Sequence, residues 1–252
     1  MKQYNNEKVI ISLTSHGVRI KYVSKTIFSI LKGSFKDIHV VLTLYKDDIK
    51  LIPDDLKLMI DNNVIELLVA DKKIGPHTKY FYTMKKYKDT PIITIDDDGI
   101  YDNEIIENLY NKYLEHPNCI CANRVHKITF KNRIINKYNK WHYEYKRELK
   151  PSNLLFATGV GGVLYPPNIL KIDDNNLQDI KNCLWADDVY LKVLEIRYNV
   201  KVVFTNVRNI LPQSFSKPIK KITQDSGLYL RNIRYKNDEY INKFRRDFNR
   251  II

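Results

Sequence analysis

The stretch Pro91–Gly99 reads PIITIDDDG, an apolar strand that runs directly into three aspartates. Two similar apolar runs precede it, VIISL within 8–13 and IHVVLTL at 38–44. Continuous apolar runs are typical of parallel strands that are covered on both faces of a sheet. We therefore expect Asp96, Asp97 and Asp98 to lie at the carboxyl end of a buried parallel strand.

Outward from this stretch, strands alternate with helices along most of the chain. Strands are predicted at 8–13, 38–44, 65–69, 91–95, 119–122, 156–165 and 200–204. Helices are predicted at 23–31, from 53 onward, and at 78–87, 103–114 and 187–198. This alternation predicts an α/β fold, a Rossmann-type βαβ sandwich with a mostly parallel central sheet.

Composition limits the class of protein. The 252 residues are 44% hydrophobic, 28% charged and 12% aromatic, which suits a packed domain and excludes a disordered chain. The N-terminal stretch has only a short apolar run, and no stretch reaches the ~18 apolar residues of a membrane span, so we expect neither a secretory signal nor a spanning helix. Three cysteines without metal-type spacing suggest reduced thiols and a cytoplasmic protein. The net charge of +13 calls for an anionic partner: nucleic acid, anionic lipid or a phosphorylated small molecule.

The aspartate cluster predicts a cation site. Ligands of open α/β sheets bind at the carboxyl ends of strands, and three adjacent carboxylates repel one another unless a cation compensates. Oxygen ligands suit Mg²⁺ or Mn²⁺, which usually share substrate phosphates. In an extended segment Asp96 and Asp98 point to the same side. The alternative is a solvated turn, which Asp and Gly also favour.

Five segments, in order, carry a resemblance to a known family. IITIDDDGIYD (Ile92–Asp102) resembles the D-x-D region of GT-A-fold nucleotide-sugar glycosyltransferases of the bacterial surface-polysaccharide, family-2-like type. SLTSHGVRI (Ser12–Ile20) is similar to the loop that cups the nucleotide base, and IGPHTKYFYTMKKY (Ile74–Tyr87) to the segment before the D-x-D strand. ATGVGGVLYPP (Ala157–Pro167) resembles the acceptor-side glycine-rich strand, and LWADDVYLKVL (Leu184–Leu194) the acidic motif of the helix that carries the catalytic base.

The resemblance covers about residues 8–205 and implies a metal-dependent enzyme. It would move a sugar from a nucleoside-diphosphate sugar, a UDP-sugar by preference, to a saccharide or lipid-linked saccharide, with Mn²⁺ or Mg²⁺ as cofactor and with inversion. The implied nucleotide-binding residues are Thr14, Arg19, Lys79, Asp96 and Asp97. The implied metal ligands are Asp98 and Asp96. Asp188 would be the general base and Asp187 would orient the acceptor. One departure is that many members supply a late histidine to the metal, whereas no histidine follows His142 here.

The acceptor side rests on weaker signals. Gly159, Gly161 and Gly162 leave no side chain to block a sugar ring, and Trp185 could stack on one, so we assign Gly161, Gly162 and Trp185 to acceptor binding. A strand bulge at the glycines and core packing of the tryptophan are the alternatives. Asp187 and Asp188 would also suit a helix N-cap.

We divide the chain into a GT-A-like catalytic domain at 1–210, with a nucleotide-binding half at about 1–100 and an acceptor half at 101–210, and a basic C-terminal tail at 211–252. In the tail, Tyr240, Phe244 and Phe248 recur at helical spacing. This helix would bind an anionic membrane at its inner face, or pack against the catalytic core or a second subunit.

Two rival functions remain open at this stage. A haloacid-dehalogenase-like phosphatase would use Asp96 as nucleophile with Mg²⁺, although the D-x-D-x-[TV] motif lacks its final residue here. The basic, aromatic-rich segment 127–150 would suit a nucleic-acid surface, although no recognised nucleic-acid motif accompanies it. We favour a protein that binds no nucleic acid.

Overall fold

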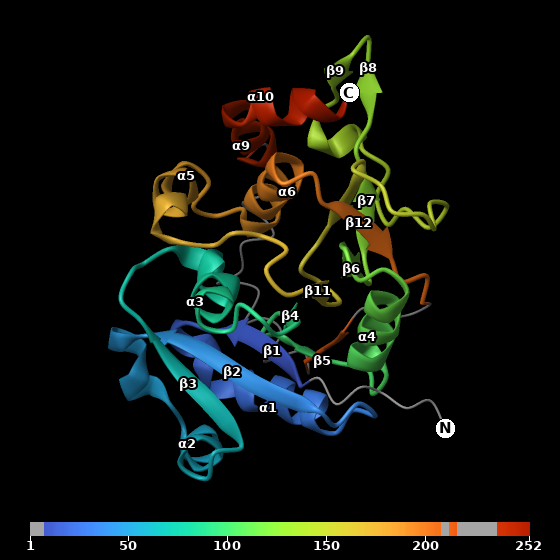
Figure 1. The fold of residues 1–252 in the computed structure, drawn as a ribbon. Coiled ribbons are helices and arrows are strands. Elements are labelled where there is room, and N and C mark those ends of the chain that lie inside the picture. The colour runs from blue at the N-terminus through green and yellow to red at the C-terminus, as the bar shows by residue number, and fades with distance from the viewer. Residues whose placement is uncertain (1–7, 208–211, 216–235) are drawn as a thin grey trace.

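The computed structural model describes residues 8–207, 212–215 and 236–252. Its centre is a seven-stranded sheet in the order β12-β6-β11-β4-β1-β2-β3 (Figure 1). Neighbouring strands pair in parallel, except that β11 is antiparallel to both β4 and β6. The strands are β1 (Val9–Thr14), β2 (Ile38–Tyr45), β3 (Ile65–Ala70), β4 (Ile92–Thr94), β6 (Cys119–Ala122), β11 (Val163–Tyr165) and β12 (Lys201–Phe204). The predicted mostly parallel α/β sheet is therefore confirmed.

Helices cover both faces of this sheet, and β1 shows how the sequence directs them. Val9, Ile11 and Leu13 pack with α1 and α4, whereas Ile10 belongs to a second core that contains α3 and α6. Figure 1 shows α1 and α3 on opposite sides of β1 and β2. The helices are α1 (Ile20–Leu31), α2 (Asp54–Asp61), α3 (Thr78–Lys86), α4 (Ile105–Glu115), α5 (Leu177–Asn182) and α6 (Asp187–Arg197).

Several short elements complete the described chain. Three two-stranded sheets join β5 (Gly99–Ile100) to β13 (Gln213–Ser214), β7 (Val125–Lys127) to β10 (Leu155–Ala157), and β8 (Phe130–Lys131) to β9 (Ile134–Ile135). Short 3₁₀ helices occur at Gly17–Arg19, Lys46–Leu51, Gly75–His77, Tyr138–Lys140, Asp174–Asn176 and Asn249–Ile251.

The predicted strand at 156–165 is wrong in one respect, because it is two strands. β10 ends at Ala157 and pairs with β7, whereas β11 begins at Val163 inside the central sheet. Gly161 and Gly162 between them have φ of 92° and 89°. These positive φ values turn the chain out of extended geometry, so a continuous strand cannot form.

The aromatic residues of segment 127–150 pack inward for the most part. Trp141 is 3% exposed, and its ring lies 5.2 Å from that of Phe156 and 6.5 Å from that of Phe248. Tyr138 contacts the Trp141 ring at 4.9 Å. Base stacking on a single strand needs exposed rings, and in this segment Tyr143 is the aromatic residue of which nearly half is exposed.

The C-terminal helices α9 (Asn237–Lys243) and α10 (Arg245–Phe248) carry the predicted amphipathic pattern, with a break at Phe244. Tyr240, Phe244 and Phe248 are buried in the same core as α6, and Arg197 of α6 pairs with Asp247 at 3.0 Å. Of the three alternatives, this part of the tail therefore packs against the catalytic core. Residues 211 and 216–235 of the tail lie outside the described residues. Within the described parts of the chain, no helix has the length and apolar character to cross a bilayer.

Candidate functional site

The candidate site lies at the carboxyl edge of β1 and β4, where five segments from distant parts of the chain meet. Because β1, β2 and β4 are parallel, the loops after β1 and β4 reach the same edge of the sheet. Helix α3 is held there by Ser12 of β1, whose hydroxyl lies 2.5 Å from the Lys79 carbonyl oxygen and 2.6 Å from the Thr83 hydroxyl. The turn between β10 and β11 and the start of α6 complete the site, as the contacts below show.

Asp97 is buried and holds Arg19. Its Oδ2 accepts a hydrogen bond from Ser15 Oγ at 2.6 Å and one from Arg19 Nε at 3.1 Å, while Arg19 Nη2 bonds to Oδ1. The same Nη2 lies 3.0 Å from Asp98 Oδ2. Burial alone would lower the pKa of Arg19, but the charges of Asp97 and Asp98 raise it above its usual range. Both oxygens of Asp97 are thus occupied by protein groups, and its role in the structure is to orient the guanidinium.

Lys79 connects the two acidic clusters. Its Nζ lies 2.8 Å from Asp96 Oδ1 and 3.1 Å from Asp187 Oδ2, the second contact being an ion pair without the alignment of a hydrogen bond. The Lys79 side chain is only 8% exposed. Burial opposes its charge, yet Asp187 and Asp96 hold the pKa of Lys79 well above its usual value. In return, although burial acts to raise it, the pKa of Asp187 is lowered by Lys79.

Asp188 is in a different electrostatic state from Asp187. Burial and the adjacent Asp187 charge raise the pKa of Asp188 to about 8, against the opposing effect of Lys79. Its Oδ1 accepts a hydrogen bond from the Gly159 amide at 3.1 Å. The helix α6 is capped by Ala186 without a side-chain bond, so the N-cap alternative for Asp187 and Asp188 is wrong.

Gly159 is tightly enclosed by these charged groups. A Cβ at this position would lie 2.8 Å from Lys79 Nζ, 3.4 Å from Asp188 Oδ1 and 3.4 Å from Asp96 Oδ1. The close approach of backbone to charged side chains is a standard reason for glycine. The position therefore marks where the backbone and the two acidic clusters come together.

The site carries an excess of negative charge. The carboxylates of Asp96, Asp97, Asp98 and Asp187, together with the carboxyl group of Asp188, face the two cations Arg19 and Lys79. Burial and the charge of Asp96 raise the pKa of Asp98 to about 6, although Arg19 opposes the shift. A carboxylate that is hard to ionise beside other carboxylates indicates a place where an added cation would be stabilised.

A divalent metal fits this donor set if substrate phosphates complete it. Across 8–207, 212–215 and 236–252, no group of three or more His, Cys, Asp or Glu side chains is arranged to hold a metal. Mg²⁺, however, is usually bound by one or two carboxylates together with phosphates and water. Asp96 and Asp98 supply such oxygens, and their side chains are 27% and 37% exposed.

The remaining predicted residues lie nearby or serve the backbone. Thr14 uses its hydroxyl to bond the Thr43 carbonyl at 2.8 Å, which ties β1 to β2 beside the site. Trp185 packs on the turn before α3, its ring atoms 3.4 Å from where a Cβ on Gly75 would lie. These two contacts are structural, and the core-packing alternative for Trp185 agrees with the second.

Gly161 and Gly162 are buried. The Gly161 carbonyl accepts a hydrogen bond from Asn123 Nδ2 at 2.8 Å, and the Gly162 carbonyl accepts one from the Asn123 backbone N–H at 3.3 Å. The bonded turn presents Val160 to solvent, 37% exposed. If an acceptor approaches this turn, Val160 is the side chain that it meets.

Sequence reasoning left four residues of the site without an assigned role. Ser15 bonds Asp97, Thr26 bonds the carbonyls of Asp97 and Gly99 at 3.0 and 2.9 Å, and the Tyr101 hydroxyl accepts from the Asp96 amide at 2.8 Å. Gly159, the fourth, stood in the glycine-rich segment, but the sequence did not distinguish it from the two glycines that follow. Ser15 and Tyr101 lie inside quoted motifs, whereas Thr26, on the inner face of α1, carried no signal.

No protein-family model matches this sequence, and no curated protein sequence matches it. Solved structures do match. S. aureus TarS 1-349 in complex with UDP superposes with a TM-score of 0.51 at 11% identity, covering 84% of this chain and 61% of that one. A longer S. aureus TarS structure gives 0.52 at 10% identity, covering 95% of this chain and 43% of that one. This chain thus spans about three fifths or less of these two structures. At such identities the likeness concerns the fold, and it confirms the predicted GT-A-like fold class.

Proposed function

We propose that this protein is a glycosyltransferase that moves a sugar from a nucleoside-diphosphate sugar, a UDP-sugar by preference, to a saccharide or lipid-linked saccharide. The observation that carries the proposal is the Lys79 bridge, which holds Asp96 at the end of β4 against Asp187 at the start of α6. The bridge thus joins the Asp96–Asp98 cluster, which would bind metal and phosphate, to the Asp187–Asp188 cluster, which would supply a general base. The superposed S. aureus TarS structure contains UDP, which supports a nucleotide donor on this fold.

In this proposal Asp96 and Asp98 hold Mn²⁺ or Mg²⁺ together with the diphosphate of the donor. When bound, the metal would neutralise the charge of the leaving diphosphate as a Lewis acid. Arg19 is oriented by Asp97 and Ser15, so its position is fixed before the nucleotide arrives, and charge-assisted bonds to phosphate are among the stronger ones. Asp97 contributes through Arg19 rather than by its own contact.

Asp188 is the general base in this proposal, and the reaction inverts the sugar. Its raised pKa, about 8, makes the carboxylate a stronger base than an ordinary aspartate once it is ionised. The Gly159 amide fixes the direction of Oδ1. Asp187 stays ionised because of Lys79, and therefore supports Lys79 electrostatically instead of taking a proton.

Two measurements separate binding from chemistry. Calorimetry with UDP and Mn²⁺ should show binding by the wild type, and Asp98→Ala should abolish its metal dependence. Asp61→Ala on the exposed face of α2 is the matched control and should bind as the wild type. Asp188→Asn should retain UDP binding and lose transfer by about 10²- to 10⁴-fold.

Three outcomes would contradict the proposal. The first is that the wild type binds no uridine, guanosine or cytidine diphosphate in the presence of Mn²⁺. The second is that Asp188→Asn transfers sugar at the wild-type rate. An aspartyl-fluoroberyllate adduct at Asp96 would instead support the phosphatase alternative, since a nucleophilic aspartate forms it.

A further inference from the structure

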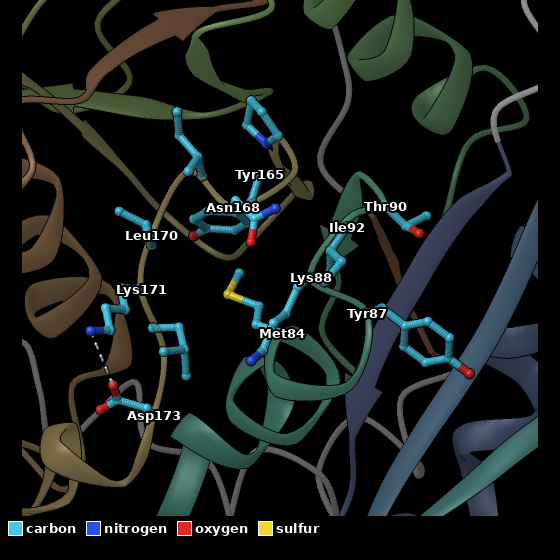
Figure 2. Close-up of a pocket in the computed structure, with 13 residues that line it drawn as sticks. Met84, Tyr87, Lys88, Thr90, Ile92, Tyr165, Asn168, Leu170, Lys171 and Asp173 are labelled. Atoms are coloured by element: carbon cyan, nitrogen blue, oxygen red, sulfur yellow. Dashed lines mark ion pairs between the residues drawn. The ribbon is translucent and has the colours of Figure 1, made fainter.

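A cavity of about 390 Å³ lies behind the candidate site, at the opposite end of β4 from Asp96. Ile92 at the start of β4 and Tyr165 at the end of β11 pair across the sheet and form part of its wall. The rest is formed by Met84 of α3, by Tyr87, Lys88 and Thr90 in the segment that follows it, and by residues 166 and 168–173 (Figure 2). The volume is at the low end of small-molecule sites, about 300 to 1,000 Å³.

Tyr165 is the unusual group in this cavity. It is 3% exposed, and no hydrogen bond joins its hydroxyl to the residues that the structure describes. Burial raises the pKa of Tyr165 well above its usual value, so the group is a neutral O–H donor. Among the described residues, the fully buried polar atoms without a partner belong to Thr43, Asn153 and Asp187, so the Tyr165 hydroxyl is an accessible donor and not a sealed one. A molecule in the cavity can therefore accept a hydrogen bond from it.

The rest of the lining is apolar inside and basic at the edge. Met84, Ile92, Leu170 and Ile172 are buried side chains of the wall. The exposed Lys88 and Lys171 belong to the same lining, and Lys171 is only loosely paired with Asp173, at 3.9 Å. Figure 2 shows this pair at one side of the cavity and Lys88 beside Met84. An apolar cavity with one hydroxyl donor in its wall and cations at its edge suits a molecule that has an apolar body, a hydrogen-bond acceptor and an anionic group.

We propose that this cavity is a second ligand site, which binds a small anionic amphiphile. The apolar body of the ligand fills the space between Met84 and Leu170, an oxygen on that body accepts a hydrogen bond from Tyr165, and the anionic group lies near Lys88 and Lys171. A soluble molecule with a ring or a short branched chain fits this volume.

The cavity shares its walls with the candidate site. Met84 lies on α3, which also carries Lys79, and Ile92 begins the strand that ends before Asp96. Tyr165 ends the segment that starts with Gly159. A ligand in the cavity would thus contact the same helix and both strands that position the charged groups.

Methylumbelliferyl phosphate is a suitable probe, because it joins a flat ring and a lactone oxygen to a phosphate. Calorimetry should show that it binds the full chain, and that inorganic phosphate and neutral methylumbelliferone each bind at least 10-fold more weakly. Tyr165→Phe keeps the ring and removes the donor, and should weaken the probe about 10-fold. Lys88→Ala should weaken it less, while the exposed Lys181→Ala on α5 is the control and should leave it unchanged.

The thermal midpoint gives a second, independent measurement. Removal of a hydroxyl that has no protein partner should leave the midpoint of Tyr165→Phe unchanged or raised, whereas loss of a hydroxyl bonded within the protein would lower it. The proposal is overturned if the probe fails to bind the wild type at millimolar concentration, if Tyr165→Phe binds it equally well, or if UDP displaces it competitively, which would place it in the donor site.

Discussion

The substitution Gly159→Ala tests whether Lys79, Asp96 and Asp188 act as one centre. A Cβ at this position would lie 2.8 Å from Lys79 Nζ, closer than real Cβ contacts allow, while the two carboxylate oxygens at 3.4 Å remain tolerable. The φ of Gly159 is outside the left-handed region, so alanine can adopt the backbone conformation. The ammonium is the end of a flexible side chain, and we expect it to retreat by about 0.6 Å.

The cost in stability should be small. At an effective dielectric constant of about 20, lengthening each of the two ion pairs by about 0.6 Å removes roughly 1 kcal/mol per pair. Replacement of glycine by alanine at a compatible φ returns about 0.4 to 1 kcal/mol through the unfolded chain. The net loss in the free energy of unfolding should be about 1 kcal/mol, measurable by urea denaturation.

The cost in activity should be much larger. The retreat of Lys79 changes the distances to Asp96 and Asp187 together, and misplacement of about 1 Å at a reacting centre can lower a rate about 100-fold. The assay uses the UDP-sugar that raises the thermal midpoint of the wild type most. We expect the rate of UDP release from it to be about 10- to 100-fold lower in Gly159→Ala than in the wild type. Val160→Ala, the exposed neighbour, is the control. Wild-type release by Gly159→Ala, with the stability as calculated, would refute the reasoning that these groups form the reacting centre.

Three further predictions follow from buried charges. Asp97→Asn should lower the free energy of unfolding by about 3 kcal/mol in urea denaturation, because it leaves buried Arg19 short of a partner, and should weaken UDP binding in calorimetry. The pKa of Asp188 is about 8 in the folded state and lower in the unfolded state, so wild-type stability should fall as pH rises from about 5 to about 8. Urea midpoints measured across this pH range should show the fall, and Asp188→Asn should make it smaller. Lys192→Met should lower the urea-derived free energy of unfolding by about 3 to 5 kcal/mol, since Glu195, its partner at 2.9 Å, stays buried, and Glu195→Gln added to it should restore much of the loss.

The fold could be predicted from the sequence because its strands are continuous apolar runs. VIISL, IHVVLTL and PIITI became β1, β2 and β4, each with bounds within one or two residues of those expected. The exception was the stretch 156–165, whose apolar residues read as one strand. The two glycines that take a positive φ accept hydrogen bonds from Asn123, and this partner is remote in the sequence.

The site was predictable in its acidic residues but not in their partners. Three adjacent aspartates at a strand end indicated a charged site, but the amino-acid sequence does not show that the Asp97 side chain points inward and bonds Ser15 and Arg19. The tail shows the same limit. Its helical spacing predicted an apolar face, but only the tertiary structure shows that α6 covers this face.

The sheet order explains why both acidic clusters depend on one lysine. β11 comes from the second half of the chain, yet it lies between β4 and β6 and pairs with both. Because β11 follows the turn at Gly159, the insertion of this strand beside β4 brings the Gly159 amide and Asp188 to the edge of the sheet where Asp96 follows β4. Lys79 then faces carboxylates from both halves, at 2.8 and 3.1 Å. Neither half could bury this ammonium alone, since each would leave the charge with a single partner, and an under-compensated buried charge is strongly destabilising. The candidate site is therefore assembled by the same strand that joins the two halves, and loss of Lys79 should disturb both acidic clusters at once.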